Sequence, residues 1–152
     1  MDINARKNSI IGKPSVIYTS SYGRLSKNQK LLLNSFNDDG IAKFDRYGDN
    51  VSIKMKDLSC LTAYTGIEYS LFSRNDRQYI VLGTQRGIHI SDELTKYLIN
   101  CGYKWSGHTH VGNTLFCLMP SDADYKTLRQ FKQKRSVIYN SVGDFYVFGE
   151  EE

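Results

Sequence analysis

Along this chain of 152 residues, short apolar runs bounded by turn residues alternate with segments that open on helix-capping residues. The clearest strands, Ile67–Phe72 and Gln78–Gly83, flank the polar stretch Arg74–Arg77 and predict a β-hairpin. Further strands are expected at Val16–Thr19, Val51–Met55, Tyr103–His108, Val137–Ser141 and Phe145–Phe148. Helices are expected after the capping residues Ser26, Ser91 and Ser121 and around Leu58–Thr62. In the helix after Ser91, the side chains of Leu94, Tyr97 and Leu98 are expected to form the buried face.

Strands interleaved with helices favour an α/β (α+β) fold, with a mixed central sheet and flanking helices, over a helical bundle. A chain of 152 residues has the size of one compact domain. Within it, we interpret residues 1–50 as an N-terminal extension made of a tail, a short strand and a helix. This extension is expected to pack on a core formed by residues 51–152.

Composition and charge exclude several classes of protein. With 11 Tyr and 7 Phe, the chain carries too many aromatic residues for a disordered segment. The net charge of +4 is spread along the chain, with a modest concentration at Arg129–Arg135, which also suits a helix C-terminus. A nucleic-acid partner is therefore disfavoured, although a nuclease stays among the alternatives below.

The cysteines and the apolar runs bear on the cellular setting. Cys60, Cys101 and Cys117 are odd in number and form no Cys-x-x-Cys pair, so neither a disulfide framework nor a cysteine-based zinc site is expected. No apolar run approaches the roughly 18 residues of a membrane span. The N-terminal residues lack the pattern of a signal peptide, so export would require another carrier.

Two of the three histidines, His108 and His110, lie one residue apart at the end of a predicted strand. Alternate residues of a strand face the same side, so both imidazoles should point together while Thr109 points away. Trp105, earlier in the same strand, is expected to pack in the core beneath them with its N–H bonded. On their own, two such histidines are equally compatible with a pair of surface imidazoles.

The sequence Ser121-x-x-Asp124 follows after a loop and has two interpretations. It is the capping box that opens many helices, in which each residue satisfies the other's backbone N–H. It also offers a carboxylate held rigidly enough to bind a metal. Two imidazole nitrogens and one carboxylate oxygen on a zinc ion would leave a fourth position open, as in hydrolytic zinc sites. The two interpretations are compatible.

The combination of these motifs with an upstream glutamate resembles the JAMM (JAB/MPN) metalloprotease family over about residues 55–148. That resemblance implies a JAMM/cytidine-deaminase-like sandwich and a zinc ion bound by His108, His110 and Asp124. It implies that Glu68 is the general base and that Ser121 hydrogen-bonds the water or the oxyanion. Glu93, the other upstream acid, lies in the first turn of a predicted helix, which explains it sufficiently.

Two features depart from the family pattern. The second histidine is followed by Val111 where family members usually have proline, and residues 111–120 form a longer loop than usual. This loop must fold so that Asp124 reaches the histidines.

A narrower similarity is to the JAB-like C-terminal toxin domains of bacterial polymorphic toxins, such as Rhs and contact-dependent inhibition effectors. It rests on Glu68–Phe72, Trp105–His110 and Ser136–Gly143. It implies delivery as part of a larger effector, action in the target-cell cytoplasm and a cognate immunity protein.

The expected function is therefore a zinc-dependent hydrolase of the peptidase or isopeptidase type, with a protein or peptide substrate. A metal-dependent nuclease and a non-catalytic binding module with the same fold are the alternatives. A zinc deaminase is disfavoured, because no Pro-Cys-x-x-Cys follows the histidines.

Overall fold

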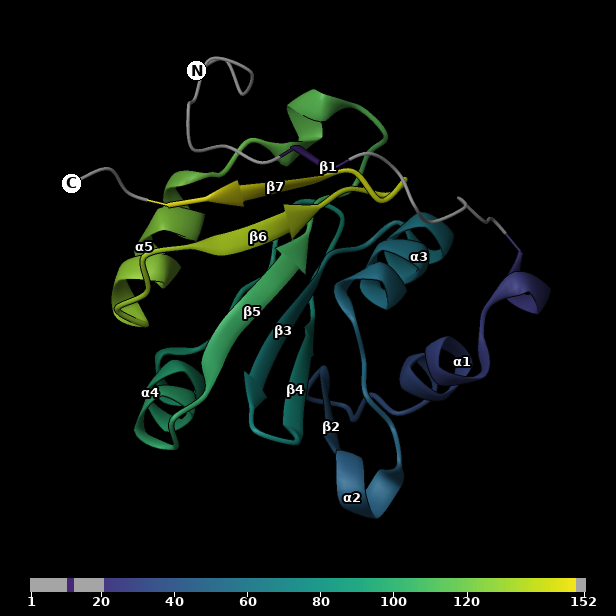
Figure 1. Ribbon diagram of the computed structural model, residues 1–152, viewed down its shortest axis with the longest axis horizontal. Helices are drawn as coiled ribbons and strands as arrows, with labels where there is room; N and C mark the ends of the chain where they lie inside the picture. The colour runs from purple at the N-terminus through teal and green to yellow at the C-terminus, as the bar shows by residue number, and fades with distance from the viewer. Residues whose placement is uncertain (1–10, 13–20, 150–152) are drawn as a thin grey trace.

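The computed structural model describes residues 11–12 and 21–149, and its centre is a mixed β-sheet (Figure 1). Seven strands lie in the order β1-β7-β6-β5-β3-β4-β2. Only β5 and β6 pair in parallel; every other neighbouring pair is antiparallel. The strands are β1 (Ile11–Gly12), β2 (Ile41–Asp45), β3 (Tyr69–Arg74), β4 (Arg77–Leu82), β5 (Lys104–Thr109), β6 (Ser136–Tyr139) and β7 (Phe145–Phe148).

Helices cover both faces of this sheet, and two separate cores result. The α-helices are α1 (Lys27–Leu33), α2 (Arg46–Asp49), α3 (Met55–Thr65), α4 (Asp92–Asn100) and α5 (Asp122–Gln130), with short 3₁₀ helices η2 (Tyr22–Arg24) and η3 (Leu115–Leu118). Side chains of α1 and α3 form one core with Tyr69, Leu71 and Ile80. Side chains of α4 and α5 form the other with Phe72 and Trp105. The expected α/β fold with flanking helices is confirmed.

Local sequence signals place the helix starts correctly. Ser26 and Ser121 each form the complete capping box that their sequences predict. Ser91 accepts a hydrogen bond from the backbone N–H of Leu94 and caps α4. The expected hairpin is also present, with β3 and β4 paired from Tyr69–Leu82 to Arg74–Arg77.

Some expectations are wrong. Residues 51–54 lie outside helices and strands, and Met55 begins α3, because alternation over five residues also fits an extended lead into a helix. The strand Ile41–Asp45 was not expected, yet it pairs with β4. Tyr97 is 50% exposed, since Thr95 and Leu98 face the core from α4 instead. The strand expected at Val16–Thr19 lies outside the described residues.

An irregularity in the pairing of β3 and β5 shapes the surface that carries the histidines. Ser70 pairs with His108 and Phe72 with Trp105, so Ser106 is an extra residue in β5. A β-bulge of this kind shifts the alternation by one position. Trp105 and His108, three residues apart, therefore face the same side, and their rings stack with centroids 4.9 Å apart.

Thr109, between the two histidines, faces the opposite core and fixes β5 in place. Its hydroxyl lies 2.6 Å from that of Thr62 on α3 and accepts a hydrogen bond from the backbone N–H of Tyr69. All three groups are buried, so each bond replaces one that water can no longer supply. The strand that bears the histidines is thus attached to both α3 and β3.

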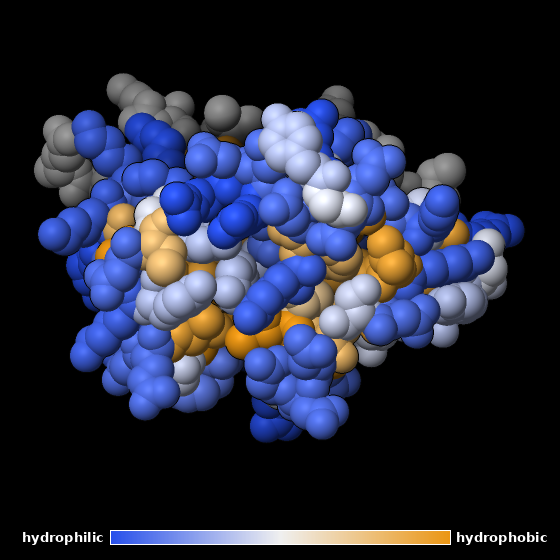
Figure 2. Space-filling view, turned by 90° about the horizontal axis from the view of Figure 1, so that it is seen from below, coloured by the Kyte–Doolittle hydropathy of each residue, from blue (hydrophilic) through white to orange (hydrophobic). Residues whose placement is uncertain are grey.

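Figure 2 shows the molecule from below the view of Figure 1, and this face is mostly hydrophilic, with patches of hydrophobic residues between the hydrophilic ones. Among the described residues, no helix has the length and apolar character needed to cross a membrane.

Replacing Thr109 with valine tests this attachment. Thr109→Val keeps the shape of the side chain but leaves the Tyr69 N–H without an acceptor in the interior. We expect a loss of about 1–3 kcal/mol in the free energy of unfolding, measured by chemical denaturation. Thr127→Val, which removes an exposed hydroxyl bonded to the Ala123 carbonyl, is the matched control and should cost less. Equal losses in the two variants would contradict the role given to Thr109.

Candidate metal centre

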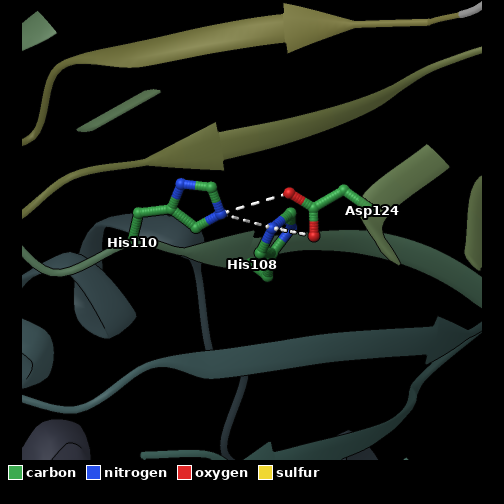
Figure 3. Close-up of side chains that lie close together, drawn as sticks. All are labelled: His108, His110 and Asp124. Carbon is green, nitrogen blue, oxygen red and sulfur yellow. Dashed lines mark hydrogen bonds and ion pairs between the residues drawn. The ribbon is translucent and has the colours of Figure 1, made fainter. Parts of the chain in front are cut away.

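His108, His110 and Asp124 converge on one point beside the end of β5 (Figure 3). His108 Nε2 lies 3.0 Å from Asp124 Oδ1, and His110 Nε2 lies 3.2 Å from Asp124 Oδ2. The two Nε2 atoms are 3.0 Å apart. Both imidazoles thus face the same side of the strand, as the sequence predicts, and the first turn of α5 brings the carboxylate to them.

These distances suit a tetrahedral metal ion. Ligand atoms at about 2.0–2.1 Å from a zinc ion, at tetrahedral angles, lie about 3.3 Å from one another. The two Nε2 atoms are 3.0 Å apart, and each lies 3.0–3.2 Å from a different oxygen of Asp124. One ligand atom from each residue lies within 4.8 Å of the other two, so the three donors can surround a single ion after the side chains relax. Two nitrogens and one oxygen are also donors that zinc accepts. The residues present therefore fit a zinc ion with one open position.

The tautomer of His110 is set by its second ring nitrogen. Nδ1 lies 2.6 Å from the carbonyl oxygen of Cys117. A carbonyl can only accept, so Nδ1–H is the donor and the Nε2 of the neutral ring carries the lone pair. This is the second interaction that metal-binding histidines ordinarily make, and it directs Nε2 at the shared point.

His108 is held by packing rather than by such a bond. It is 3% exposed and stacks on Trp105, whose indole N–H donates to Ser70 Oγ at 2.9 Å. Trp105 therefore lies in the core with its N–H bonded, as expected. Within the described part of the chain, His108 Nδ1 is the one buried side-chain nitrogen or oxygen that has no hydrogen-bond partner.

Asp124 takes part in both the helix cap and the cluster. Its Oδ2 accepts a hydrogen bond from the Ser121 backbone N–H at 2.9 Å, and its own N–H donates to Ser121 Oγ at 3.1 Å. The same carboxylate faces both histidines. The capping box thus fixes the direction of the side chain that completes the cluster, and the Ser121 hydroxyl lies on the wall of the same cavity.

The loop between the histidines and α5, residues 111–120, follows a defined path that lets Asp124 reach the histidines despite the length of the loop. The backbone N–H of Ser141 donates to the Gly112 carbonyl, and Asn140 Nδ2 donates to the Thr114 carbonyl. Leu118, at the end of η3, is fully buried. These contacts bend the loop back across the end of β6 and deliver Asp124 to the histidines.

Glu68 immediately precedes β3 and lines the same cavity as the cluster. It is 8% exposed, and burial, opposed by the charge of His110 and reinforced by that of Asp124, raises its pKa from 4.5 to about 7. A carboxyl group with this pKa accepts or donates a proton near neutral pH. Glu93, the other acid considered, is exposed on α4 and is not on the cavity wall.

The charges of the cluster are tightly linked. Burial raises the pKa of Asp124, but its hydrogen bonds to the two histidines outweigh this and hold it well below its usual range. Burial lowers the pKa of His108. Burial also acts to lower the pKa of His110, but the hydrogen bond and charge of Asp124 outweigh it and leave that pKa raised. Without a metal, Asp124 therefore carries its negative charge, and His110 takes up an additional proton more readily than His108.

The cavity around the cluster has a volume of about 560 Å³ and includes residues that the sequence analysis did not single out. Arg86 comes from the loop after β4 and Phe116 from η3. Ile88, Ile90 and Met119 form an apolar part of its wall. No motif marks these residues, because they belong to the site through the folding of two separate loops.

The buried Glu68 carboxyl makes stability depend on pH. Its raised pKa means that the native state binds this proton more tightly than the unfolded chain, so the metal-free protein loses stability as pH rises from 4.5 to about 7. Glu68→Gln should therefore be more stable than the unmodified protein by about 2–3 kcal/mol at pH 8 and by less than about 1 kcal/mol at pH 5. Denaturant unfolding with a chelator present measures the difference.

The exposed Glu93 provides the control, since Glu93→Gln makes the same chemical change at the surface. Its effect should be small at both pH values. A Glu68→Gln effect that is equal at pH 5 and pH 8 would show that this carboxyl is not desolvated.

Comparisons with protein-family models, with curated proteins and with solved structures give no match for this chain.

Proposed function

We propose that this protein is a zinc-dependent hydrolase that cleaves amide bonds in proteins or peptides. The observation that carries the proposal is the convergence of His108, His110 and Asp124 to separations of 3.0–3.2 Å beside a buried glutamate. The resemblance of these positions to the JAMM pattern supports the same assignment. A purely structural cluster would not require the carboxyl of Glu68 to remain buried in the same cavity.

A zinc ion in this position would supply acidification of the attacking water and polarisation of the scissile carbonyl. Glu68, as the carboxylate, takes a proton from that water while the water oxygen bonds to the carbonyl carbon of the substrate. When the carbon–nitrogen bond breaks, Glu68 returns the proton to the leaving amine. A pKa of about 7 suits both transfers. The Ser121 hydroxyl would donate a hydrogen bond to the developing oxyanion, a contribution of up to about 3 kcal/mol.

The biological setting is also proposed from resemblance. The segments Glu68–Phe72, Trp105–His110 and Ser136–Gly143 are similar to JAB-like toxin domains, so we propose that the hydrolase is the toxin module of a larger bacterial effector. It would act in the cytoplasm of the target cell and be neutralised by an immunity protein.

Zinc binding tests the ligand set without any substrate. Asp124→Asn retains an acceptor for the helix cap but removes the charge, and we expect zinc affinity to fall at least about a hundredfold. Asp122→Asn, an exposed neighbour in the same helix turn, is the control and should bind zinc as the unmodified protein does. Competition titration with a chelator measures both. Unmodified protein that contains no zinc at neutral pH would favour the non-catalytic binding module.

The base is tested separately from the metal. Glu68→Gln should retain zinc and lose about 10²–10⁴-fold in hydrolysis of a protein substrate, because the amide cannot take the proton that the carboxylate is proposed to accept. It should equally lose toxicity when expressed inside a bacterium. Glu93→Gln makes the same change on α4 and should keep both activities. Full activity in Glu68→Gln would remove Glu68 as the base, and degradation of nucleic acid instead of protein would favour the nuclease.

A further inference from the structure

The sheet order places the metal centre between two loops of different chemistry. The Thr84–Gly87 turn follows β4 and is attached to the residue just before β3, since the backbone N–H of Glu68 donates to the Thr84 carbonyl. The Leu115–Leu118 helix follows β5 and is attached to the turn after β6 through Asn140. Glu68 and the two histidines lie at the ends of β3 and β5, between these loops. A bond cut at the centre therefore has one loop on each side.

The loop after β5 presents an aromatic side chain to solvent at the edge of the cavity. Phe116 is 87% exposed, and its neighbour Leu115 is 40% exposed. Their backbone is not free to turn inward, because Leu118 is buried and the N–H of Met119 donates to the Phe116 carbonyl. An aromatic ring held out over a cavity offers apolar contact area to whatever enters it.

The loop after β4 presents a cation. Arg86 lines the cavity and is exposed, and no described carboxylate pairs with it. Its turn is rigid: the Thr84 hydroxyl donates to the Gly87 carbonyl and accepts from the Arg86 N–H. Apart from the histidines, the other charged groups on the cavity wall are the carboxylates Glu68 and Asp124. A guanidinium in this setting is suited to bind a carboxylate.

A second, more open groove borders the cavity at Arg86. It shares Gln85 and Arg86 with the cavity, and the glycines Gly66 and Gly83 are among its other lining residues. A side chain at Gly83 could not be accommodated, since its Cβ would lie 2.5 Å from Ile88 Cγ1. A groove that adjoins the cavity of the reaction centre suits a long chain better than a small amide.

We propose, on the basis of the amide hydrolase function above, that the substrate is an extended polypeptide and that the protein recognises substrate residues on both sides of the cleaved bond. An apolar residue on one side packs against Phe116, and a carboxylate on the other side pairs with Arg86. The carboxylate comes from an acidic side chain or from the end of the chain. The two loops thus determine specificity, whereas the metal centre determines the reaction.

The test uses the zinc-loaded protein and three peptide mixtures made from a bacterial lysate. The first is an untreated digest, and the second is the same digest after all carboxyl groups have been converted to amides. In the third, proteins are amidated before digestion, so that only the new chain ends carry carboxylates. Cleavage sites and rates are measured by mass spectrometry.

We expect cleavage beside apolar residues with a carboxylate on the opposite side, and a loss of about tenfold on the fully amidated peptides. Cleavage of the third mixture identifies the chain end as the bound carboxylate, and its loss identifies acidic side chains. Arg86→Gln should lose about tenfold on untreated peptides and become insensitive to amidation. Phe116→Ala should lose the preference for apolar residues.

Matched controls lie on α2, at the end of the sheet away from Glu68. Arg46→Gln and Tyr47→Ala remove an exposed arginine and an aromatic ring that is 84% exposed, and neither residue lines the cavity. Both should cleave as the unmodified protein does. Equal rates on amidated and untreated peptides, or equal behaviour of Arg86→Gln and Arg46→Gln, would overturn this substrate class while leaving the hydrolase in place. Zinc-loaded protein that cleaves none of the three mixtures would overturn the hydrolase itself and this inference with it.

Discussion

The position of β5 is the constraint on which the rest of the site depends. This strand is paired on both sides, antiparallel to β3 and parallel to β6, and the Thr109 hydroxyl ties it to α3 and to the β3 backbone. Because the side chains of a strand alternate, fixing Thr109 toward one core fixes His108 and His110 toward the other side. The Ser106 bulge then brings Trp105 under His108. Packing, hydrogen bonding and strand alternation thus act on the same few residues.

Polar groups at and beside the end of β5 are buried, although burial is energetically unfavourable for them. Glu68 is 8% exposed, and His108 Nδ1 has no hydrogen-bond partner among the described residues. Each arrangement lowers stability relative to a paired or apolar alternative. A cost of this kind at a cavity wall is typical of a site selected for chemistry rather than for folding. The proposed hydrolysis uses the desolvation directly, since it is burial that raises the pKa of Glu68 toward neutrality.

The capping box at Ser121 shows how a structural device can also serve a reaction. The backbone N–H of Ser121 holds the Asp124 carboxylate, so the side chain is oriented before any metal binds. Preorganisation of this kind reduces the entropy lost on ligand binding. The loop that precedes α5 also orients side chains of the site. Its Cys117 carbonyl fixes the His110 tautomer, and the same segment holds Phe116 at the edge of the cavity. The residues proposed to bind metal and those proposed to bind substrate therefore share one supporting loop.

Features that depend on neighbours within a few residues could be predicted from the amino-acid sequence. These are the capped starts of α1, α4 and α5, the β3–β4 hairpin and the common orientation of His108 and His110. Caps and strand alternation are local, so no distant contact is needed to predict them. The three-dimensional fold is what brings Asp124 to the histidines through residues 111–120, because that path depends on Asn140 and Ser141 from another turn. It also decided the burial of Glu68, the β2 edge strand and the places of Arg86 and Phe116, since each follows from contacts between segments far apart in the chain.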